Sequence, residues 1–204
     1  MKKFASLGLV LFATVSLAAC GDTKDHSSSS SSSTKVAETT VSSSLVESSS
    51  ATEKSDSNFV DTADQASFDG SILKGNAYSI KITDHKVIQP GEKGNEYGDS
   101  PVIAFWYDTM VAEDYDNSTA IDPTSAWIMN FKAIQDNDPN LVNELNIASL
   151  PDEQYLDSQT ATIKPGGTVS NAVAYTLTDS ETPVTLKASS MMGADFGSKE
   201  FSIK

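Results

Sequence analysis

Apolar and polar residues alternate along much of the chain after residue 70, and this period of two is typical of β-strands with one buried face. The clearest case is residues 78–82, and the predicted strand continues to Ile88. Similar patterns predict strands at residues 71–73, 127–133, 160–164, 169–177, 184–188 and 201–203. Residues 102–107 are almost entirely apolar, which predicts a central strand covered on both faces.

One helix is predicted among these strands. Asp138 and Pro139 form a typical helix start, and Leu141 and Leu145 lie on one face of the helix that would follow. We expect about two turns. Seven or eight short strands separated by turn signals, together with one short helix, predict a mainly β domain over residues 69–204. The expected fold is an antiparallel immunoglobulin-like β-sandwich.

The hydropathy pattern of residues 1–20 is that of a secretory signal peptide. Lys2 and Lys3 precede an apolar stretch over residues 7–17, and small residues follow it. This stretch is shorter than the roughly 20 residues that a helix needs to cross a bilayer, so we do not expect a transmembrane helix here.

Residues 21–68 have the composition of a disordered linker. Serine dominates, with an unbroken run from Ser27 to Ser33, and the few apolar residues cannot offset the entropy of ordering the segment. A flexible coil of this length has a mean reach of about 35–40 Å. We therefore expect a tether that holds the folded domain away from its point of attachment.

The junction of these two segments, Leu17-Ala18-Ala19-Cys20, resembles the lipobox of bacterial lipoproteins. The resemblance implies that lipid, including palmitate, is attached to Cys20 and that the chain is cut before this residue. It also implies that the protein is held on the extracellular face of the cell membrane. The alternative is an ordinary cleaved signal followed by a free cysteine. Because Cys20 is the only cysteine, a disulfide within one chain is excluded.

A set of core and turn positions over about residues 68–204 matches a known pattern. These positions are Tyr78–Ile82, Pro101–Ile103, Phe131–Gln135, Leu141, Leu145, Ile163–Gly167, Ala174–Asp179 and Pro183-Val184. On these residues the domain resembles the family of domains of unknown function numbered 5067, found on exported lipoproteins of Gram-positive bacteria. The resemblance implies an immunoglobulin-like sandwich and no catalytic residues. Asp108-Thr109-Met110 departs from the pattern, in which an aromatic residue and an asparagine often follow this strand.

The charge balance excludes one class of partner. The formal net charge is −14, and the chain contains no arginine. Because a nucleic-acid-binding domain needs a basic face, we exclude nucleic acid as a partner, and we do not expect the folded domain to bind anionic lipid headgroups. Cations, basic proteins and cationic polymers remain as electrostatic partners, beside the simpler interpretation of a soluble, self-repelling surface.

The sequence lacks the usual catalytic motifs. Its two histidines, His26 and His85, cannot form a zinc site of the metalloprotease type. Ser71 and Lys74 match the Ser-x-x-Lys pattern of penicillin-binding enzymes, but the partner motifs Ser-Asp-Asn and Lys-Thr-Gly are missing. We therefore predict that the protein is not an enzyme.

Two acidic loops are candidate calcium sites, because Ca²⁺ binds six to eight oxygen atoms. Their acidic residues are Glu113, Asp114 and Asp116 in one loop and Asp136 and Asp138 in the other. Neither loop has the EF-hand pattern, and a solvated loop and a helix cap are the alternative interpretations. Trp106, Tyr107 and Trp127 all lie in predicted strands, where core packing is the expected use, although an exposed member would suit a glycan or a peptide.

These observations favour a lipid-anchored, non-enzymatic binding module for an extracytoplasmic protein or a cell-envelope polymer. The alternative function is a calcium-dependent binding module that uses residues 113–118 or 136–138. An enzyme that relies on carboxylates alone is the least favoured hypothesis. A transporter's substrate-binding protein is also unfavoured, because a single domain of this size cannot form the usual two-lobed cleft.

Overall fold

The structure of the protein is a computed structural model that describes residues 57–204. The predicted signal peptide, Cys20 and residues 21–56 of the predicted tether lie outside the described residues. Within the described part of the chain, no helix is long and apolar enough to cross a membrane.

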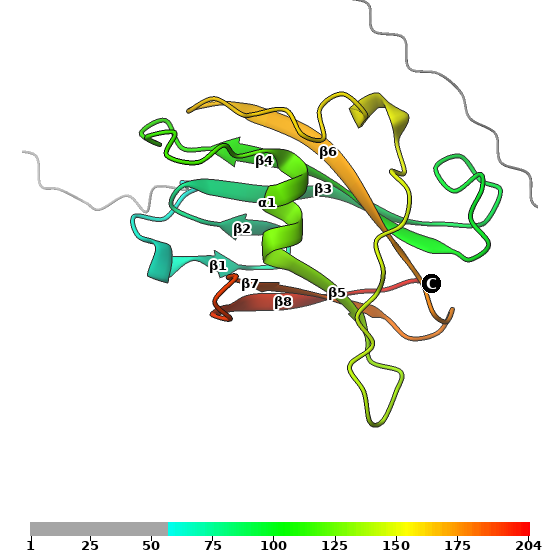
Figure 1. Ribbon diagram of the computed structural model, residues 1–204. Coiled ribbons are helices and arrows are strands. Elements are labelled where there is room, and N and C mark those ends of the chain that lie inside the picture. The colour runs from blue at the N-terminus through cyan, green and yellow to red at the C-terminus, as the bar shows by residue number, and fades with distance from the viewer. Residues whose placement is uncertain (1–56) are drawn as a thin grey trace, which may run out of the picture. The chain divides into compact units, whose positions relative to one another are not determined.

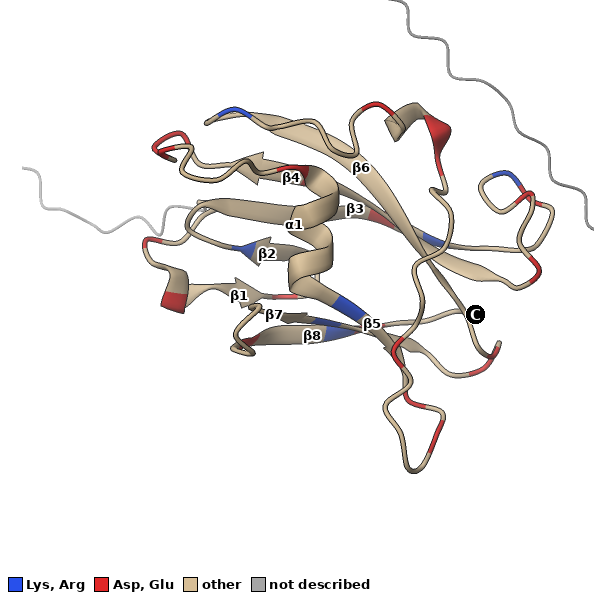
Figure 2. Cartoon of the chain, in the orientation of Figure 1, with Lys and Arg blue, Asp and Glu red and all other residues tan. Residues whose placement is uncertain are grey.

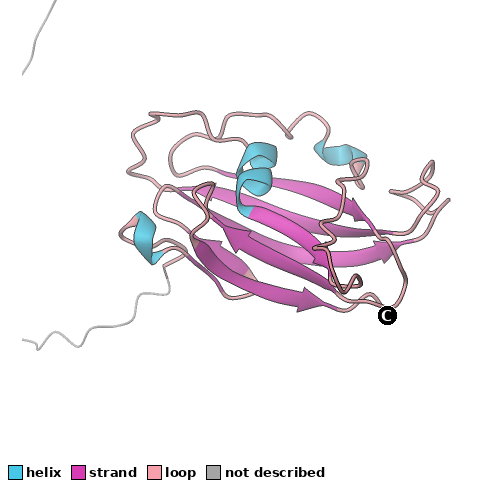
Figure 3. Cartoon of the chain, turned by 60° about the horizontal axis from the view of Figure 1, so that its bottom comes forward, coloured by secondary structure: helices cyan, strands magenta, loops and turns pink. Residues whose placement is uncertain are grey.

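Residues 57–204 contain two antiparallel sheets, which confirm the predicted antiparallel β-sandwich (Figure 1). The five-stranded sheet has the order β1-β2-β3-β4-β6, and the three-stranded sheet has the order β5-β7-β8. The strands are β1 (Ser67–Phe68), β2 (Ile72–Lys74), β3 (Tyr78–Ile88), β4 (Val102–Val111), β5 (Phe131–Gln135), β6 (Thr168–Thr176), β7 (Val184–Ser189) and β8 (Asp195–Phe201). The helix α1 (Pro123–Asn130) lies to one side of the stacked strands and leads directly into β5 (Figure 3).

The central strand β4 is covered on both faces, as its apolar sequence predicts. On the inner face, Phe105 and Tyr107 pack against Trp127, with ring centroids 5.8 Å and 4.4 Å from the indole. On the outer face, Val102 and Ala104 are buried in a smaller cluster, which Ile88 of β3 and Ala174 of β6 complete. A run of consecutive apolar residues is stable here because each face of the strand has its own covering layer.

The predicted strand at residues 127–133 is wrong in its first half, because α1 occupies that stretch. Asp122 is the N-cap, and its carboxylate accepts a hydrogen bond from the Ser125 amide at 2.9 Å. Pro123 follows in the first turn, where its missing N–H costs nothing. The chain becomes extended only at Phe131, so Trp127 reaches the core from a helix and not from a strand.

The predicted helix after Asp138 is also wrong. The Asp138 carboxylate accepts hydrogen bonds from the amides of Asn140 and Leu141, at 2.7 and 2.9 Å, and this local turn is not continued as a helix. Leu141 and Val142 are 70% and 76% exposed. The cap forms without its helix because no neighbouring surface buries the apolar side chains that follow it.

Residues 143–148 lie extended instead and join the two sheets at one edge of the sandwich. The Leu145 amide donates to the Ala133 carbonyl of β5 at 2.8 Å, and the Ala148 amide donates to the Ala174 carbonyl of β6 at 2.8 Å. Leu145, which was predicted on the helix, is therefore buried through sheet-like pairing. This segment covers part of the β6 edge, which would otherwise be open for pairing with another chain.

The predicted strand at residues 160–164 is not formed. Ile163 is buried, and its amide donates to the Ile121 carbonyl at 2.8 Å, so a loop rather than a sheet holds this apolar residue in the core. One apolar anchor in a short polar stretch does not distinguish a strand from such a loop.

The folded part begins before the predicted boundary at residue 69. Residues 57–68 contain a short 3-10 helix (Ala63–Gln65) and β1, and Phe68 is buried against Phe131 with ring centroids 5.1 Å apart. The Ser79 hydroxyl donates to the Asn58 carbonyl at 2.7 Å. Hydrogen bonds to the β2–β3 region hold this segment in place. Its order could not be predicted from its low hydropathy, because hydropathy does not report hydrogen bonds.

The buried side chain of Gln135, at the end of β5, organises the turn between β6 and β7. Its carbonyl oxygen accepts from the Thr178 amide at 2.7 Å, and its amide nitrogen donates to the Thr182 carbonyl at 2.8 Å. In the same turn, Asp179 accepts from the amides of Glu181 and Thr182 at 2.8 and 2.7 Å. These two amides and the Asn137 side chain hold the pKa of Asp179 well below its usual value.

We expect the Asp179 turn to lose stability in acid. Because the pKa is lower in the folded state than in the unfolded chain, the carboxylate stabilises the fold above about pH 4 and loses this effect as the pH falls toward the folded-state pKa. Asp179→Asn should therefore lower the Tm most near neutral pH, and the difference from the wild type should shrink below about pH 4. Thermal unfolding from neutral pH into acid measures this, with Asp157→Asn on an exposed loop as the control. A difference that does not change with pH would contradict the prediction.

Candidate functional site

A cleft of about 810 Å³ lies between the β3–β4 loop and residues 147–153, the segment that runs beside the edge of β6. We call it the distal cleft; its lining residues are 93–100, 102, 147–151, 153 and 176. Its floor contains Val102 and Thr176, which are register partners on β4 and β6. The eleven residues of β3, which span roughly 35 Å, separate this cleft from Asn58, near the start of the described chain. The β3–β4 loop is at the right of Figure 1.

The first wall of the distal cleft is a loop organised around Asn95. The Asn95 side chain is buried, and its amide nitrogen donates to the carbonyls of Ile88 and Ser100, at 3.2 and 2.9 Å. It thereby ties the last residue of β3 to the residues just before β4. The Asn95 backbone donates to the Glu92 carbonyl and accepts from the Gly91 amide, both at 2.9 Å. The loop is therefore fixed by its own hydrogen bonds before any ligand arrives.

The two walls of the cleft touch at Gly94. This residue has a positive φ of 93°, and a Cβ placed on it would lie 2.4 Å from the Pro151 carbonyl oxygen. The β3–β4 loop can approach the opposite wall this closely only because position 94 has no side chain.

We expect Gly94→Ala to separate the walls. It combines an unfavourable positive φ with a clash against backbone, and we expect a loss of about 1–3 kcal/mol in the free energy of unfolding. Gly91→Ala is a matched control, since Gly91 also has a positive φ of 82° but a Cβ there would meet no atom within 4 Å. Chemical denaturation of both variants measures the difference. If the two variants lose the same stability, the contact between the walls contributes nothing.

The lining of the distal cleft combines acidic groups with exposed apolar side chains. Glu96, Asp99 and Glu153 contribute carboxylates, and Lys93 contributes the one amino group among the lining residues. Tyr97 is 99% exposed and Ile147 is 50% exposed. Figure 2 shows acidic positions on the β3–β4 loop and on the loop opposite it. The volume of this cleft lies within the range of known ligand-binding pockets.

Trp106 lies beside this region and is the partly exposed member of the three aromatic residues singled out in the sequence. Tyr107 and Trp127 are buried in the core. The Trp106 indole donates to Asp152 Oδ2 at 3.2 Å, and the Gln154 side chain donates to the same oxygen at 2.6 Å. Desolvation acts to raise the pKa of Asp152, but these hydrogen bonds outweigh it and hold the pKa below its usual value. Asp152 is therefore a charged residue that already has partners.

The first predicted calcium loop lines a different cleft. Glu113, Asp114 and Asp116 lie with Asp61 around a hollow of about 790 Å³, whose other lining residues are 57, 59–60, 76–77, 112 and 115. We call it the proximal cleft, because it lies next to Ser57, where the described chain begins. Hydrogen bonds from Ser118, including its amide at 2.9 Å, lower the pKa of Asp116.

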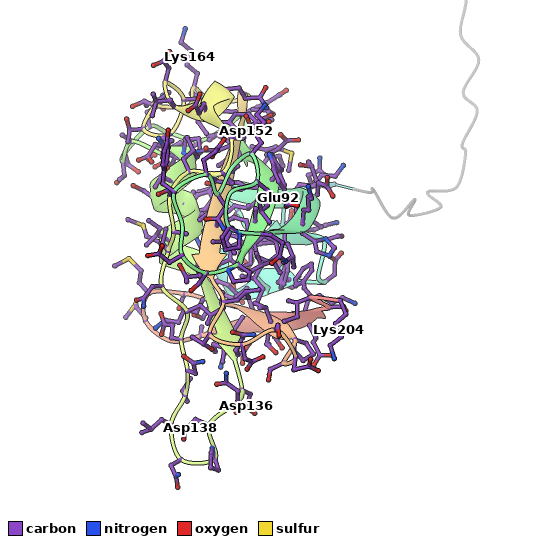
Figure 4. The ribbon with its side chains drawn as sticks, turned by 90° about the vertical axis from the view of Figure 1, so that its right-hand side faces the viewer. Glu92, Asp136, Asp138, Asp152, Lys164 and Lys204 are labelled. Carbon is purple, nitrogen blue, oxygen red and sulfur yellow. The ribbon has the colours of Figure 1, made fainter. Side chains whose placement is uncertain are left out.

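The second predicted calcium loop lines neither the proximal nor the distal cleft. Asp136 and Asp138 lie on the loop that projects at the bottom of Figure 4, while Asp152 and Glu92 lie in its upper part. Among residues 57–204, no group of three or more His, Cys, Asp or Glu side chains is placed to hold a metal ion. Calcium binding by either loop therefore stays a prediction, and thermal unfolding in millimolar calcium and in chelator would test it.

The residues considered for catalysis are not arranged as a catalytic unit. The Ser71 hydroxyl donates to Asp69 at 2.8 Å, and the Lys74 amino group donates to the Ser57 carbonyl at 2.8 Å, so the two members of the Ser-x-x-Lys motif have other partners. His85 is exposed and packs edge-to-face on Phe201, with ring centroids 4.9 Å apart.

The distal cleft was not predicted from the sequence. The Lys93–Ser100 stretch has the glycines and polar residues of an ordinary loop, and its partner wall lies about 50 residues later in the chain. The one usable signal was Tyr97 between two glycine-containing turns, which places an aromatic residue on a loop. The sequence singled out Glu113, Asp114 and Asp116 as calcium ligands, which stays a prediction, and it did not place Asp61 beside them.

Comparisons with known proteins agree with this fold. A family model described as a domain of unknown function (DUF5067) matches residues 48–190, which begins and ends earlier than the resemblance seen in the sequence. A solved structure of a candidate lipoprotein from Staphylococcus aureus subsp. aureus NCTC 8325 superposes with a TM-score of 0.54 and 21% sequence identity. The match covers 68% of this chain and 92% of that one. No curated protein matches the chain.

Proposed function

This chain belongs to the DUF5067 family of domains of unknown function, and on that premise we propose that it is a lipid-anchored, non-enzymatic binding module whose ligand occupies the distal cleft. The ligand is an extracytoplasmic protein or a cell-envelope polymer. Lipid on Cys20 would attach the protein to the extracellular face of the membrane, and the tether would carry the domain. The candidate lipoprotein that shares the fold is compatible with this proposal.

The observation that carries the proposal is the fixed geometry of the distal cleft. Its first wall is held by the buried Asn95 side chain, and its two walls meet at Gly94 and Pro151. A cleft that exists before binding loses little conformational entropy when a ligand enters, so more of the contact energy appears as affinity. This arrangement suits binding, and it requires no catalytic group.

The direction of the cleft also supports the proposal. The described chain begins at Ser57, close to the turn between β2 and β3, where Lys74 donates to its carbonyl. The distal cleft lies at the other end of β3. If Cys20 anchors the chain, the tether joins the domain at Ser57. The distal cleft, at the other end of β3, is then free to face away from the membrane.

Photocrosslinking on intact cells tests the proposal. A photoreactive residue at Tyr97 is expected to form a discrete adduct, whereas the same residue at Leu141, which is also highly exposed but lies on another loop, is expected to form none. Gly94→Ala, added to the chain that carries the photoreactive residue at position 97, should reduce the yield of the adduct, since it separates the walls of the cleft. Equal labelling from both positions, or no adduct from Tyr97, would sink the proposed site.

A further inference from the structure

The distal cleft has an excess of negative charge that the protein itself leaves uncompensated. Its lining carries three carboxylates, from Glu96, Asp99 and Glu153, and one amino group, from Lys93. Lys93 lies near Asp152, which it helps to keep ionised, so its charge is partly matched outside the lining. The local excess follows the formal net charge of the chain, which is −14.

Two of these carboxylates are available to a ligand. Glu96 accepts a hydrogen bond from the Gly94 amide at 3.0 Å. Among residues 57–204, Asp99 and Glu153 form no hydrogen bond or ion pair through their carboxylates, and the three ion pairs present are Lys132–Glu144, Lys187–Asp195 and Lys204–Glu181. Asp99 and Glu153 come from opposite walls, so a ligand between them would meet negative charge on both sides.

The exposed apolar residues of the cleft suit a cation with a long aliphatic stem. Tyr97 presents nearly all of its ring to solvent, and a lysine ammonium or an arginine guanidinium is attracted to the face of such a ring. Ile147 on the opposite wall offers an apolar surface for the methylene groups of the same side chain. An anionic polymer would be repelled by the carboxylates that flank these groups.

The backbone of the cleft suits an extended chain. Within the described residues, the amides of Tyr97, Asp99, Ser149 and Leu150 donate to no protein acceptor. Unpaired backbone groups along two facing walls can bind the carbonyls of an extended peptide, while side-chain pockets give specificity.

From these features, and resting on the proposed function, we infer that the distal cleft binds an extended segment of another protein through lysine or arginine side chains. The basic side chains lie between Asp99 and Glu153 and pack on Tyr97. The peptide backbone forms hydrogen bonds with backbone groups of the two walls.

Selection from a random peptide library on the chain comprising residues 21–204 tests this inference, because every described element lies within that range. Peptides enriched on the wild type should carry lysine or arginine, and their affinity should fall as salt is raised. Asp99→Asn combined with Glu153→Gln should weaken them by about fivefold to twentyfold, the effect of losing two exposed charge pairs. Glu113→Gln combined with Asp116→Asn removes the same charge from the proximal cleft and should change affinity by less than about twofold.

A second pair of variants separates the aromatic contact from charge. Tyr97→Ala should weaken the selected peptides several-fold, whereas Tyr97→Phe keeps the ring face and should bind as the wild type does. All substituted side chains are exposed, and the Tm of each variant shows that it is folded. Three outcomes would each overturn the inference. The enriched peptides could lack basic residues, or the two charge variants could lose the same affinity. The third is that the wild type enriches no more peptide than the Gly94→Ala chain does.

The crosslinking experiment distinguishes this inference from the proposed function. If the Tyr97 adduct on cells is a polymer that resists protease, including one that bears amines, the cleft binds a ligand but the inference about a protein segment fails. If the adduct is digested by protease and its crosslinked fragment contains lysine or arginine, both stand. If Tyr97 gives no adduct, the proposed function itself fails.

Discussion

Replacing Trp127 by alanine is expected to lower the free energy of unfolding by about 3–5 kcal/mol, the usual cost of truncating a fully buried tryptophan. Trp127 is 0% exposed and lies between Tyr107 and Phe131, whose ring centroids are 4.4 and 4.5 Å from its own. Its indole also donates to the Tyr175 hydroxyl at 2.8 Å, which links α1 to β6. Truncation therefore removes packing and a buried hydrogen bond at the point where helix and both sheets meet.

Thermal and chemical unfolding measure this loss, and the expected fall in Tm is roughly 6–20 °C for a domain of this size. Ile128→Ala is the matched control, because Ile128 is the next residue of the same helix and is 51% exposed; we expect it to cost less than about 1 kcal/mol. Trp127→Phe keeps most of the ring volume but loses the donor to Tyr175, so it should fall between the two. If alanine at both positions costs the same, Trp127 is not the centre of the core.

The identity of Trp127 as a core residue could be predicted from sequence, but its secondary structure could not. Residues 127–133 alternate in hydropathy as a strand does, yet α1 ends at Asn130 and only the second half is extended. A short helix that feeds directly into a strand leaves too few residues to show either period clearly. The deciding signal was local: Asp122 and Pro123 are an N-cap and a first-turn proline.

The same pair of residue types at Asp138 and Pro139 led to the opposite error. Asp138 does cap the amides that follow it, but the chain then turns back and pairs with β5 and β6. Both sites satisfy the local chemistry of a helix start, and packing decides which continues: after Asp122 the side chain of Trp127 is buried, and after Asp138 Leu141 and Val142 stay exposed. A cap alone does not offset the cost of nucleating a helix.

The long strands were predictable because their apolar periodicity extends over many residues. β3 and β4 form where they were predicted, and β4 has the continuous apolar sequence of a strand with two covered faces. β6 also forms, but it does not alternate in burial, because residues 171–175 are all buried. The distal cleft was not predictable, because its two walls are joined by the topology of the sandwich and not by proximity in sequence. Gly94 shows the difference: in the sequence it is a loop glycine, and in the fold it is the point where two distant segments touch.

Replacing Cys20 by alanine is expected to remove the protein from the membrane almost completely. Each buried CH₂ group of an attached lipid adds about 0.8 kcal/mol of membrane affinity, so stable anchoring depends on the two or three chains that the resemblance to the lipobox implies. The variant should appear in the medium, or remain as a precursor whose signal peptide is uncut.

Fractionation of cells into membrane and medium, with the N-terminus of each product determined by mass spectrometry, measures this outcome. Ser27→Ala is a suitable control, because it changes one residue of the serine run and leaves the Leu17–Cys20 motif intact. A Cys20→Ala protein that has lost its signal peptide and is still bound to the membrane would contradict lipid anchoring. The domain would then be attached in some other way. Without a tether from Cys20 to Ser57, the distal cleft would have no reason to face away from the membrane.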